Sequence, residues 1–403
     1  MTPTFAWVLA GLGMLGSSLW IWHWLAIRRH RHLQIWLREC PADPPEGGWP
    51  TLAMIFAARN EAESVDRATR SMLAQDYPDL DVVAVDDRST DETGPILDAV
   101  AAENPHLQVV HIKELPPGWL GKNHALQSAA EASEAEWLLF TDADVVFAPE
   151  TLRRAVALVI QEGLDHLTVA PDVPTENLGE RIFIAMFTLL ISVHAPPWKV
   201  GERNSRVGMG IGAFNLVRAE VFRDIGGFRH LKLSIDDDLR LGETIKIAGY
   251  RQRLAMGQGM ISVRWHVGLW GMVRGLEKNF FARTNFRLPL VAFAMIVLVM
   301  IAVMPFVGLF VGPWWTRAYC ALGIFAVTRI LAEGRGQNGV AWYHGLLLPV
   351  GAIACVIALL RSTWFTLRRG GVRWRDHLYP LAELKEHTWR RDAWLREVWR
   401  STH

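Results

Sequence analysis

The pattern of apolar and polar positions separates a central part with short apolar runs from terminal parts with long ones. In the central part, strand-like runs alternate with helical patterns, after a linker rich in proline and glycine. This alternation predicts a parallel sheet flanked by helices, with ligands bound beyond the carboxyl ends of the strands. The predicted strands are 51–57, 81–86, 107–112 and 136–141, and the predicted helices are 61–74, 92–103 and 122–132.

The first long apolar run, 5–27, is long enough to cross a bilayer. Arg28 to His32 follow it at once, and no Lys or Arg precedes it, so the positive-inside rule puts the N-terminus outside and the next domain in the cytoplasm. A signal peptide would carry its basic residues before the apolar run, and this run does not.

Three further apolar segments lie at 289–311, 316–332 and 341–361. Hydropathy favours the first and third as membrane spans, because the middle one carries Arg317 and Arg329 and is predicted to be re-entrant or tilted. The basic residues after 361 prefer the cytoplasm and favour an even number of crossings, hence two of the three. Hydropathy and charge therefore disagree on this part of the chain.

Two other stretches are predicted to lie in the headgroup plane. The apolar stretch 181–198 contains His194 and ends in Ala-Pro-Pro-Trp, and a buried core helix is its alternative. Residues 381–400 mix Leu, Trp and Arg at helical spacing.

Composition adds limits to this picture. The net charge of +1 gives no indication of a nucleic-acid partner, and three scattered cysteines argue against disulfides or zinc. The 19 tryptophans suit membrane interfaces. The predicted organisation is a membrane helix with a basic flank at 1–39, a cytoplasmic domain at 40–285, membrane segments at 286–362 and a basic amphipathic tail at 363–403.

Acidic pairs follow two of the predicted strands. Asp142 and Asp144, separated by one small residue, suit a divalent cation that also bridges a diphosphate. Asp86 and Asp87 could accept hydrogen bonds from a nucleotide base and ribose. The structural alternatives are solvated loop carboxylates for the first pair and a helix cap, with Ser89 and Asp91, for the second.

Two more motifs carry candidate chemistry. Gly121 and Lys122 open a helix, where backbone N–H groups and an ammonium suit phosphate, although a solvated lysine is the alternative. Asp236, Asp237 and Asp238 precede a helical pattern, and their mutual repulsion would raise one pKa and give a better base. Their alternative is an acidic cap at a helix N-terminus.

Together these motifs, with residues 52–61 and Gln75-Asp-Tyr-Pro78, resemble an inverting family 2 glycosyltransferase with the GT-A fold over residues 51–250. Residues 116–122 and 275–279 resemble the membrane-bound branch that glycosylates carotenoid, hopanoid or similar lipids. The Q-x-x-R-W motif of polymerising members is replaced by Gly-Leu-Glu-Lys-Asn at 275–279, which argues against a processive polysaccharide synthase.

The resemblance implies a mixed GT-A sheet, a nucleotide-diphospho-sugar donor with a UDP-sugar favoured, and Mg²⁺ or Mn²⁺. It implies that Asp144 is the direct metal ligand, with Asp142 as ribose or metal-shell partner. It makes Asp238 the general base and Asp237 the next candidate, and likens 208–215 to an acceptor-side loop, with a tight turn as alternative. The residues assigned to the donor are Ala57, Arg59, Glu61, Asp86, Asp87, Gly121, Lys122, Asp142 and Lys278. For Lys278, which could neutralise the leaving diphosphate, an interfacial anchor is the alternative.

The resulting hypothesis is a metal-dependent, multi-pass enzyme of the cell membrane that transfers one sugar to the hydroxyl of a lipid. The alternatives are a polysaccharide-synthase type of glycosyltransferase and a non-catalytic nucleotide-sugar-binding membrane protein. A nucleotidyltransferase would need a glycine-rich loop that 51–64 lacks.

Overall fold

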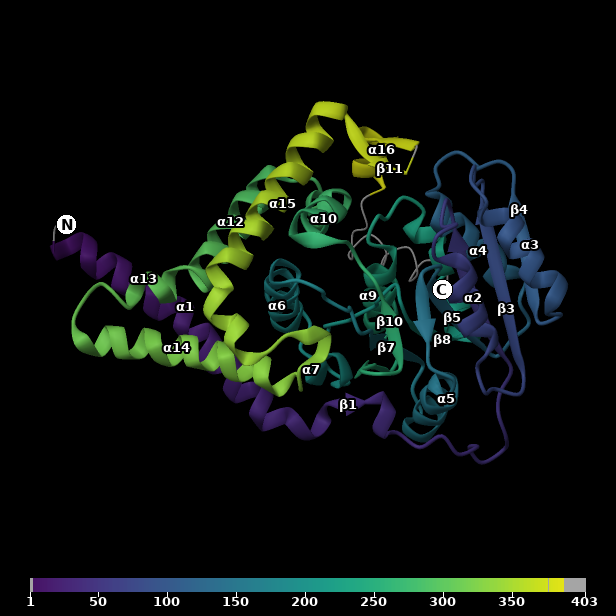
Figure 1. Cartoon of the computed structure of the whole chain (residues 1–403), viewed down its shortest axis with the longest axis horizontal. Helices are drawn as coiled ribbons and strands as arrows, with labels where there is room; N and C mark the ends of the chain where they lie inside the picture. Colours follow the sequence, from purple (N-terminus) through teal and green to yellow (C-terminus); the bar gives the residue numbers. More distant parts are fainter. Residues whose placement is uncertain (1–2, 376, 388–403) are drawn as a thin grey trace, which may run out of the picture. The chain divides into compact units, whose positions relative to one another are not determined.

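The computed structural model describes residues 3–375 and 377–387 (Figure 1). Its Cα positions group into two compact units whose segments alternate along the chain. The helical unit takes 3–33, 174–194 and the described residues of 265–382, and the sheet unit takes 34–173, 195–264 and 383–387. The predicted division into four consecutive domains follows membrane topology and stays a prediction.

The sheet unit contains an eight-stranded mixed sheet with the order β1-β9-β7-β8-β5-β2-β3-β4. Strand β8 is antiparallel to β5 and β7, and the other pairs are parallel. The four predicted strands are β2, β3, β4 and β5, each within one residue of its predicted ends. The strands are β1 (Ile35–Trp36), β2 (Leu52–Ala58), β3 (Leu80–Asp87), β4 (Leu107–Ile112), β5 (Trp137–Asp142), β7 (His166–Ala170), β8 (Asn215–Arg218) and β9 (Gln252–Met256), with β6 (Val145–Phe147) and β10 (Ile261–Val263) paired separately.

Helices cover both faces of this sheet, which explains why its strands are apolar at successive positions. On β2, Met54 and Phe56 belong to a core shared with α2, α3 and α5. Their neighbours Ala53 and Ile55 belong to a second core, shared with α4, α8 and α9. The helices are α2 (Val65–Leu73), α3 (Thr93–Glu103), α4 (Gly121–Ala132), α5 (Thr151–Glu162), α7 (Pro197–Gly201), α8 (Ala219–Asp224) and α9 (Asp237–Ile247).

The helical unit is built from the two ends of the chain and one insertion from its middle. Its helices are α1 (Pro3–His30), α6 (Leu178–His194), α10 (Gly268–Gly275), α11 (Asn279–Arg283), α12 (Leu288–Ala302), α13 (Met304–Gly308), α14 (Trp314–Glu333) and α15 (Leu348–Arg369), with a hairpin of β11 (Gly371–Trp374) and β12 (His377–Pro380). A single turn, α16 (Leu381–Glu386), is all that the structure describes of the helix predicted at 381–400; the remainder lies outside the described residues.

Helix α1 packs between the two arms of a hairpin formed by α12–α13 and α14. It is antiparallel to α12, since a Cβ on Gly13 would lie 2.8 Å from the Met304 carbonyl oxygen while Trp20 Nε1 donates to the Ile301 carbonyl at 2.6 Å. It is parallel to α14, because its early residue Trp7 contacts Trp315 and its late residue Trp24 contacts Phe325 edge to face. These close approaches through glycine are typical of helices packed in a membrane.

Three helical stretches are long and apolar enough to cross a membrane: Pro3–Leu33, Leu178–Gly201 and Trp342–Arg369. The first and last contain the spans predicted at 5–27 and 341–361. The stretch 178–201 is longer than expected, although its α-helix is interrupted after His194. The span predicted at 289–311 is broken at Val303, before Pro305, because proline cannot continue the helical hydrogen bonds. The middle segment, with its two arginines, is the unbroken helix α14.

Candidate active site

The parallel strands β2, β3, β4 and β5 end at one edge of the sheet. Their register pairs Ala58 with Asp86, Asp86 with His111 and Ala57 with Asp142. The sequence-predicted residues that follow β2 and end β3 and β5 therefore come together, and the N-terminus of α4 joins them.

The Asp87 carboxylate lies against the first turn of α4. A Cβ on Gly121 would overlap Asp87 Oδ2, so only glycine permits this approach. Arg88 Nε donates to Asp87 Oδ1 at 2.7 Å, and Arg59 Nη1 lies 3.8 Å from Oδ2. Asp87, Arg59 and Arg88 thus form one charged group beside Gly121 at the start of α4.

Asp86 is held by a histidine that the sequence analysis did not single out. Asp86 Oδ1 accepts from the Ser89 backbone N–H at 3.1 Å, and its Oδ2 lies 3.0 Å from His111 Nδ1. The other ring nitrogen of His111 lies 2.9 Å from Asp98 Oδ1. The hydrogen bonds to Asp86 and Asp98 raise the pKa of His111. Its place at the end of the strand 107–112 was the signal that could have identified it.

The turn after β2 is tied to the loop after β3. Asn60 adopts φ +54°, and its side-chain oxygen accepts from the Thr90 N–H at 2.8 Å. The Asn60 N–H donates to Ser89 Oγ and the Glu61 N–H donates to Thr93 Oγ1. Ser89 therefore fixes this turn rather than capping α3.

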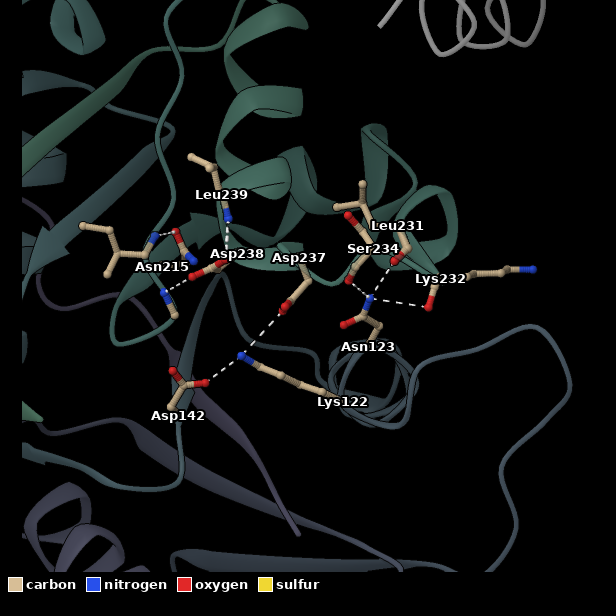
Figure 2. Close-up of polar contacts among 12 residues, drawn as sticks. Lys122, Asn123, Asp142, Asn215, Leu231, Lys232, Ser234, Asp237, Asp238 and Leu239 are labelled. Atoms are coloured by element: carbon tan, nitrogen blue, oxygen red, sulfur yellow. Dashed lines mark hydrogen bonds and ion pairs between the residues drawn. The ribbon is translucent and has the colours of Figure 1, made fainter. Parts of the chain in front are cut away.

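Lys122 lies among the carboxylates of the other motifs (Figure 2). Its Nζ lies 2.6 Å from Asp142 Oδ1 and 3.6 Å from Asp237 Oδ2. Burial would lower the pKa of Lys122, but Asp142, Asp237 and Asp238 outweigh it and the pKa is raised. The lysine is therefore a permanent positive charge between the end of β5 and the start of α9.

Asp238 is positioned by backbone groups. Its Oδ2 accepts from the Gly212 N–H at 2.6 Å, and its Oδ1 accepts from the Leu239 N–H at 2.7 Å (Figure 2). Burial raises the pKa of the Asp238 carboxyl, Lys122 opposes the rise, and Asp142 adds to it. The direction is the expected one, but its causes are burial and Asp142, not repulsion within the triplet.

The other two acids of the triplet have partners of their own. Asp236 lies 3.1 Å from Arg240 Nε, and Ser234 Oγ lies 3.1 Å from its other oxygen. Asp237 is buried beside Lys122. The three neighbouring carboxylates therefore point to three different surroundings.

Glycines of the loop 208–215 allow the close approach of β5 and α9. A Cβ on Gly212 would lie 2.6 Å from Asp142 Oδ2 and 3.2 Å from Asp238 Oδ2. A Cβ on Gly210 would overlap the Asp238 carbonyl. Close packing by itself therefore explains these glycines. They also allow the Asp142 and Asp238 carboxylates to lie close to the same backbone position, Gly212.

Asn123, next to Lys122, was also missed. Its side-chain nitrogen donates to the carbonyls of Leu231 at 2.6 Å and Ser234 at 3.0 Å (Figure 2). The Leu120 N–H donates to the Lys232 carbonyl at 2.8 Å. The start of α4 therefore holds the loop that leads into Asp237 and Asp238.

The residues at the end of β5 fit a divalent cation that shares its coordination with a substrate. Asp142 and Asp144 are half-buried carboxylates separated by the buried Ala143. Within the described residues, no three His, Cys, Asp or Glu side chains form a group that could hold an ion by themselves. Mg²⁺ needs only one or two carboxylates when phosphates supply further ligands, so the pair suits an ion carried with a diphosphate.

Lys278 belongs to the helical unit, at the end of the 3₁₀ turn Leu276–Lys278. Its Nζ lies 3.9 Å above the Trp374 ring. It is the one candidate donor residue that belongs to the helical unit.

Residues 54–226 match the sequence model of Glycosyl transferase family 2. The beta-monoglucosyldiacylglycerol synthase of Nostoc sp. is 26% identical over 200 residues, which are 48% of this chain and 41% of that protein. The 4,4'-diaponeurosporenoate glycosyltransferase of Staphylococcus haemolyticus is 22% identical over 236 residues, covering 57% and 60%. The chain thus spans less than two thirds of either relative.

A solved structure, the mannosyltransferase PcManGT from Pyrobaculum calidifontis in complex with GDP-Man and Mn2+, aligns with a TM-score of 0.52 at 18% identity. The alignment covers 89% of this chain and 99% of the other, and at this identity it shows the fold alone. With the sheet order, the acidic edge and the family match in agreement, the chain carries a family 2 glycosyltransferase domain of GT-A fold.

Proposed function

We propose that this protein is an integral-membrane, inverting glycosyltransferase that moves a sugar from a nucleotide-diphospho-sugar to the hydroxyl of a lipid. The observation that carries the proposal is the Asp238 carboxylate, whose pKa is raised and which lies beside Asp142 across Gly212. A base at this position can reach an acceptor hydroxyl while the donor lies along the sheet edge.

In the proposed reaction, Asp238 removes the proton of the acceptor hydroxyl as its oxygen forms a bond to the anomeric carbon. The bond from that carbon to the diphosphate breaks, and the electron pair leaves with the nucleoside diphosphate. Lys122, whose Nζ lies 2.6 Å from Asp142, would stabilise this charge. Asp144, with Asp142, would hold Mg²⁺ or Mn²⁺, which when bound neutralises charge on the diphosphate.

In the proposal, the nucleotide part of the donor is bound by the candidate residues that follow or end β2 and β3. Asp86 and Asp87 would accept hydrogen bonds from the base and ribose of a UDP-sugar, and Arg59 and Glu61 would border the nucleotide with Ala57. His111 and Asn60 would act as positioning residues, because they fix Asp86 and the turn after β2. Lys278 is retained as a candidate partner of the leaving diphosphate.

A lipid acceptor is supported by the names of two relatives, one a diacylglycerol glycoside synthase and the other a diaponeurosporenoate glycosyltransferase. It is also supported by three stretches long and apolar enough to cross a membrane. Two other relatives take part in succinoglycan biosynthesis, so a polysaccharide acceptor is the second candidate.

The decisive experiment offers purified protein a panel of nucleotide sugars with Mn²⁺ and lipid vesicles, and measures nucleoside diphosphate and radiolabelled product. We expect release of nucleoside diphosphate and a product that partitions into organic solvent. Label found only in water-soluble polymer would favour a polysaccharide synthase. Binding of the nucleotide sugar with no release would identify a non-catalytic binding protein.

The proposed orientation places the sheet unit in the cytoplasm, because the basic residues Arg28 to Arg31 stand at the C-terminal end of α1. Two cysteine variants test it in a chain whose native cysteines are replaced. Phe310→Cys lies in the turn of the α12–α14 hairpin, and Asp43→Cys lies after α1; both positions are exposed. An impermeant thiol reagent should label Phe310→Cys and not Asp43→Cys in intact cells, and the reverse pattern would refute the orientation.

A further inference from the structure

A basic cavity of about 240 Å³ lies at the C-terminal end of α15, between α10, the turn 276–278 and the β11–β12 hairpin. Among its described lining residues, a single carboxylate, Glu277, faces six cationic side chains. These cations are Arg274, Lys278, Arg361, Arg369, Arg373 and Arg375. The surplus of positive charge indicates an anionic ligand, because like charges are costly to gather without one.

Aromatic rings and Glu277 hold several of these cations in place. Glu277 accepts from Arg361 at 3.0 Å and from Arg369 at 3.1 Å. Arg361 also lies over the rings of Trp270 and Phe365, at 4.9 and 4.8 Å from their centroids. Glu277 neutralises only one of the two arginines that it holds. The described lining residues are therefore preorganised and together carry a net positive charge, as suits a phosphate site.

Helix α15 joins the two free ends of the α12–α14 hairpin. Before α15 begins, Gly345 packs on Val327 near the end of α14, where a Cβ would lie 3.0 Å from Val327 Cγ1. Near the other end of α15, the Phe281 N–H donates to Ser362 Oγ at 2.9 Å, a few residues before α12 begins. If α12 and α14 cross the bilayer, both ends of α15 lie on one side of it, and α15 lies along the membrane surface although it is long enough to cross.

The exposed side chains of α15 agree with this placement. An apolar stripe of exposed residues runs along one face with helical spacing: Val350, Ile353, Ile357, Leu360, Trp364 and Leu367. The opposite face, which includes Gly351, Ala358 and Ser362, is buried within the helical unit. Arg361, which lines the basic cavity, lies one helical turn from Ile357 and from Trp364, so the edge of the stripe borders the cavity.

We propose that this cavity binds the phosphate of an anionic membrane lipid, whose acyl chains lie along the stripe of α15. Several guanidinium groups in one cavity match the oxygens of a phosphodiester, and rings at the rim suit the headgroup layer. The proposal rests on the membrane placement given under the proposed function, but not on catalysis. It assigns the site to a lipid that anchors or orients the enzyme at the bilayer surface.

The test measures binding of dioctanoylphosphatidylglycerol to the detergent-purified full chain by titration calorimetry. The variant Arg274→Gln/Arg373→Gln removes two exposed cavity arginines and leaves both ion pairs of Glu277 intact. The control Arg287→Gln/Arg368→Gln removes two exposed arginines of the same unit that do not line the cavity. We expect the cavity variant to weaken binding about tenfold or more, because charge-assisted contacts are lost, and the control to bind as the unchanged protein does.

Four outcomes would overturn the proposal. Three of them are equal weakening by both double variants, equal affinity for dioctanoylglycerol, which has no phosphate, and displacement of the lipid by UDP. Displacement by UDP would assign the cavity, with Lys278, to the leaving diphosphate instead. Inorganic phosphate should compete only weakly, since it lacks the acyl chains; competition as strong as that of the lipid would reduce the site to a free-phosphate site. Binding that survives in an inactive Asp238→Asn protein keeps this proposal separate from the glycosyltransferase one.

Discussion

The two units of this protein treat their large apolar side chains in opposite ways. In the sheet unit such side chains fill two cores on the faces of the sheet, and Phe140 alone contacts Phe222 and Phe228. In the helical unit they also cover the outside. Of the described large apolar residues that are exposed, all but Ile160 belong to the helical unit.

The charges show the reverse pattern. Asp86, Asp87, Asp142 and Asp238 gather at one edge of the sheet, where they carry the proposed chemistry. The helical unit instead gathers arginines at the end of one apolar helix. The difference teaches that the two units suit different solvents. Burial of apolar surface stabilises the sheet unit in water, whereas the exposed apolar surface of the helical unit suits contact with lipid.

The largest expected effect tests whether the chemistry belongs to the sheet unit. Asp238→Asn should lower turnover by roughly 10²–10⁴-fold while nucleotide-sugar binding stays nearly intact, because the base contacts the acceptor. Asp237→Asn is the matched control, since it removes the neighbouring carboxylate and leaves Asp142 beside Lys122. Initial rates measure turnover, and donor titrations measure the binding of the nucleotide sugar. If Asp237→Asn is the inactive variant, the base is Asp237.

Metal dependence is the next expected effect. EDTA should abolish activity, and Mn²⁺ or Mg²⁺ should restore it. Asp144→Asn should lower activity on the order of a hundredfold, because charge stabilisation of several kcal/mol depends on the ion. A protein that stays fully active in EDTA would show that Lys122 and the arginines stabilise the charge on the diphosphate without a metal ion.

The same substitution in each unit tests the difference in solvent. Ile296→Lys, at an exposed position of α12, should cost about 2.5–3.5 kcal/mol if α12 crosses the bilayer. Ile160→Lys, on α5, should change stability by less than about 0.5 kcal/mol. Thermal unfolding in lipid nanodiscs measures both. Ile353→Lys, on the stripe of α15, should fall between them, since a lysine at the surface reaches water. Equal costs at Ile296 and Ile160 would contradict the comparison.

The smallest effect concerns His111 and pH. Its pKa is raised by Asp86 and Asp98, so the charged pair stabilises the fold fully below the ordinary histidine pKa of 6.5. This contribution is lost as the pH rises through the raised pKa. His111→Gln should weaken donor binding a few-fold at low pH and less at high pH, whereas His106→Gln, exposed and at the start of β4, should not. A pH-independent difference would leave His111 a purely structural role.

Half of the strands of the main sheet, β2 to β5, could be predicted from the sequence, because they are apolar runs, and two of them end in acidic residues. The same strand ends predicted that Asp86, Asp87 and Asp142 would meet. His111 and Asn123 escaped prediction since their roles depend on contacts across the sheet and with the loop 231–234, which no local pattern reveals. The separate surroundings of Asp236, Asp237 and Asp238 were hidden for the same reason.

Hydropathy predicted the apolar helices but not their arrangement. The segment with Arg317 and Arg329 was ranked below the other two, yet it forms the unbroken helix α14 beside α1. Arg317 lies at the start of that helix, where its Nε donates to the Gly312 carbonyl at 2.9 Å. The break at Val303 and the contacts of α15 at both ends depend on packing, so a count of apolar residues could not supply them.

The alternation of the two units along the chain has a consequence for biosynthesis. Helix α1 leaves the ribosome before residues 34–264, and its partners α12 and α14 follow only after those residues have been made. At roughly 5–20 residues per second this interval lasts on the order of tens of seconds. During that time the glycine face of α1 has no α12 or α14 to cover it. Most of the sheet unit is therefore translated before the helices of the helical unit can pack together.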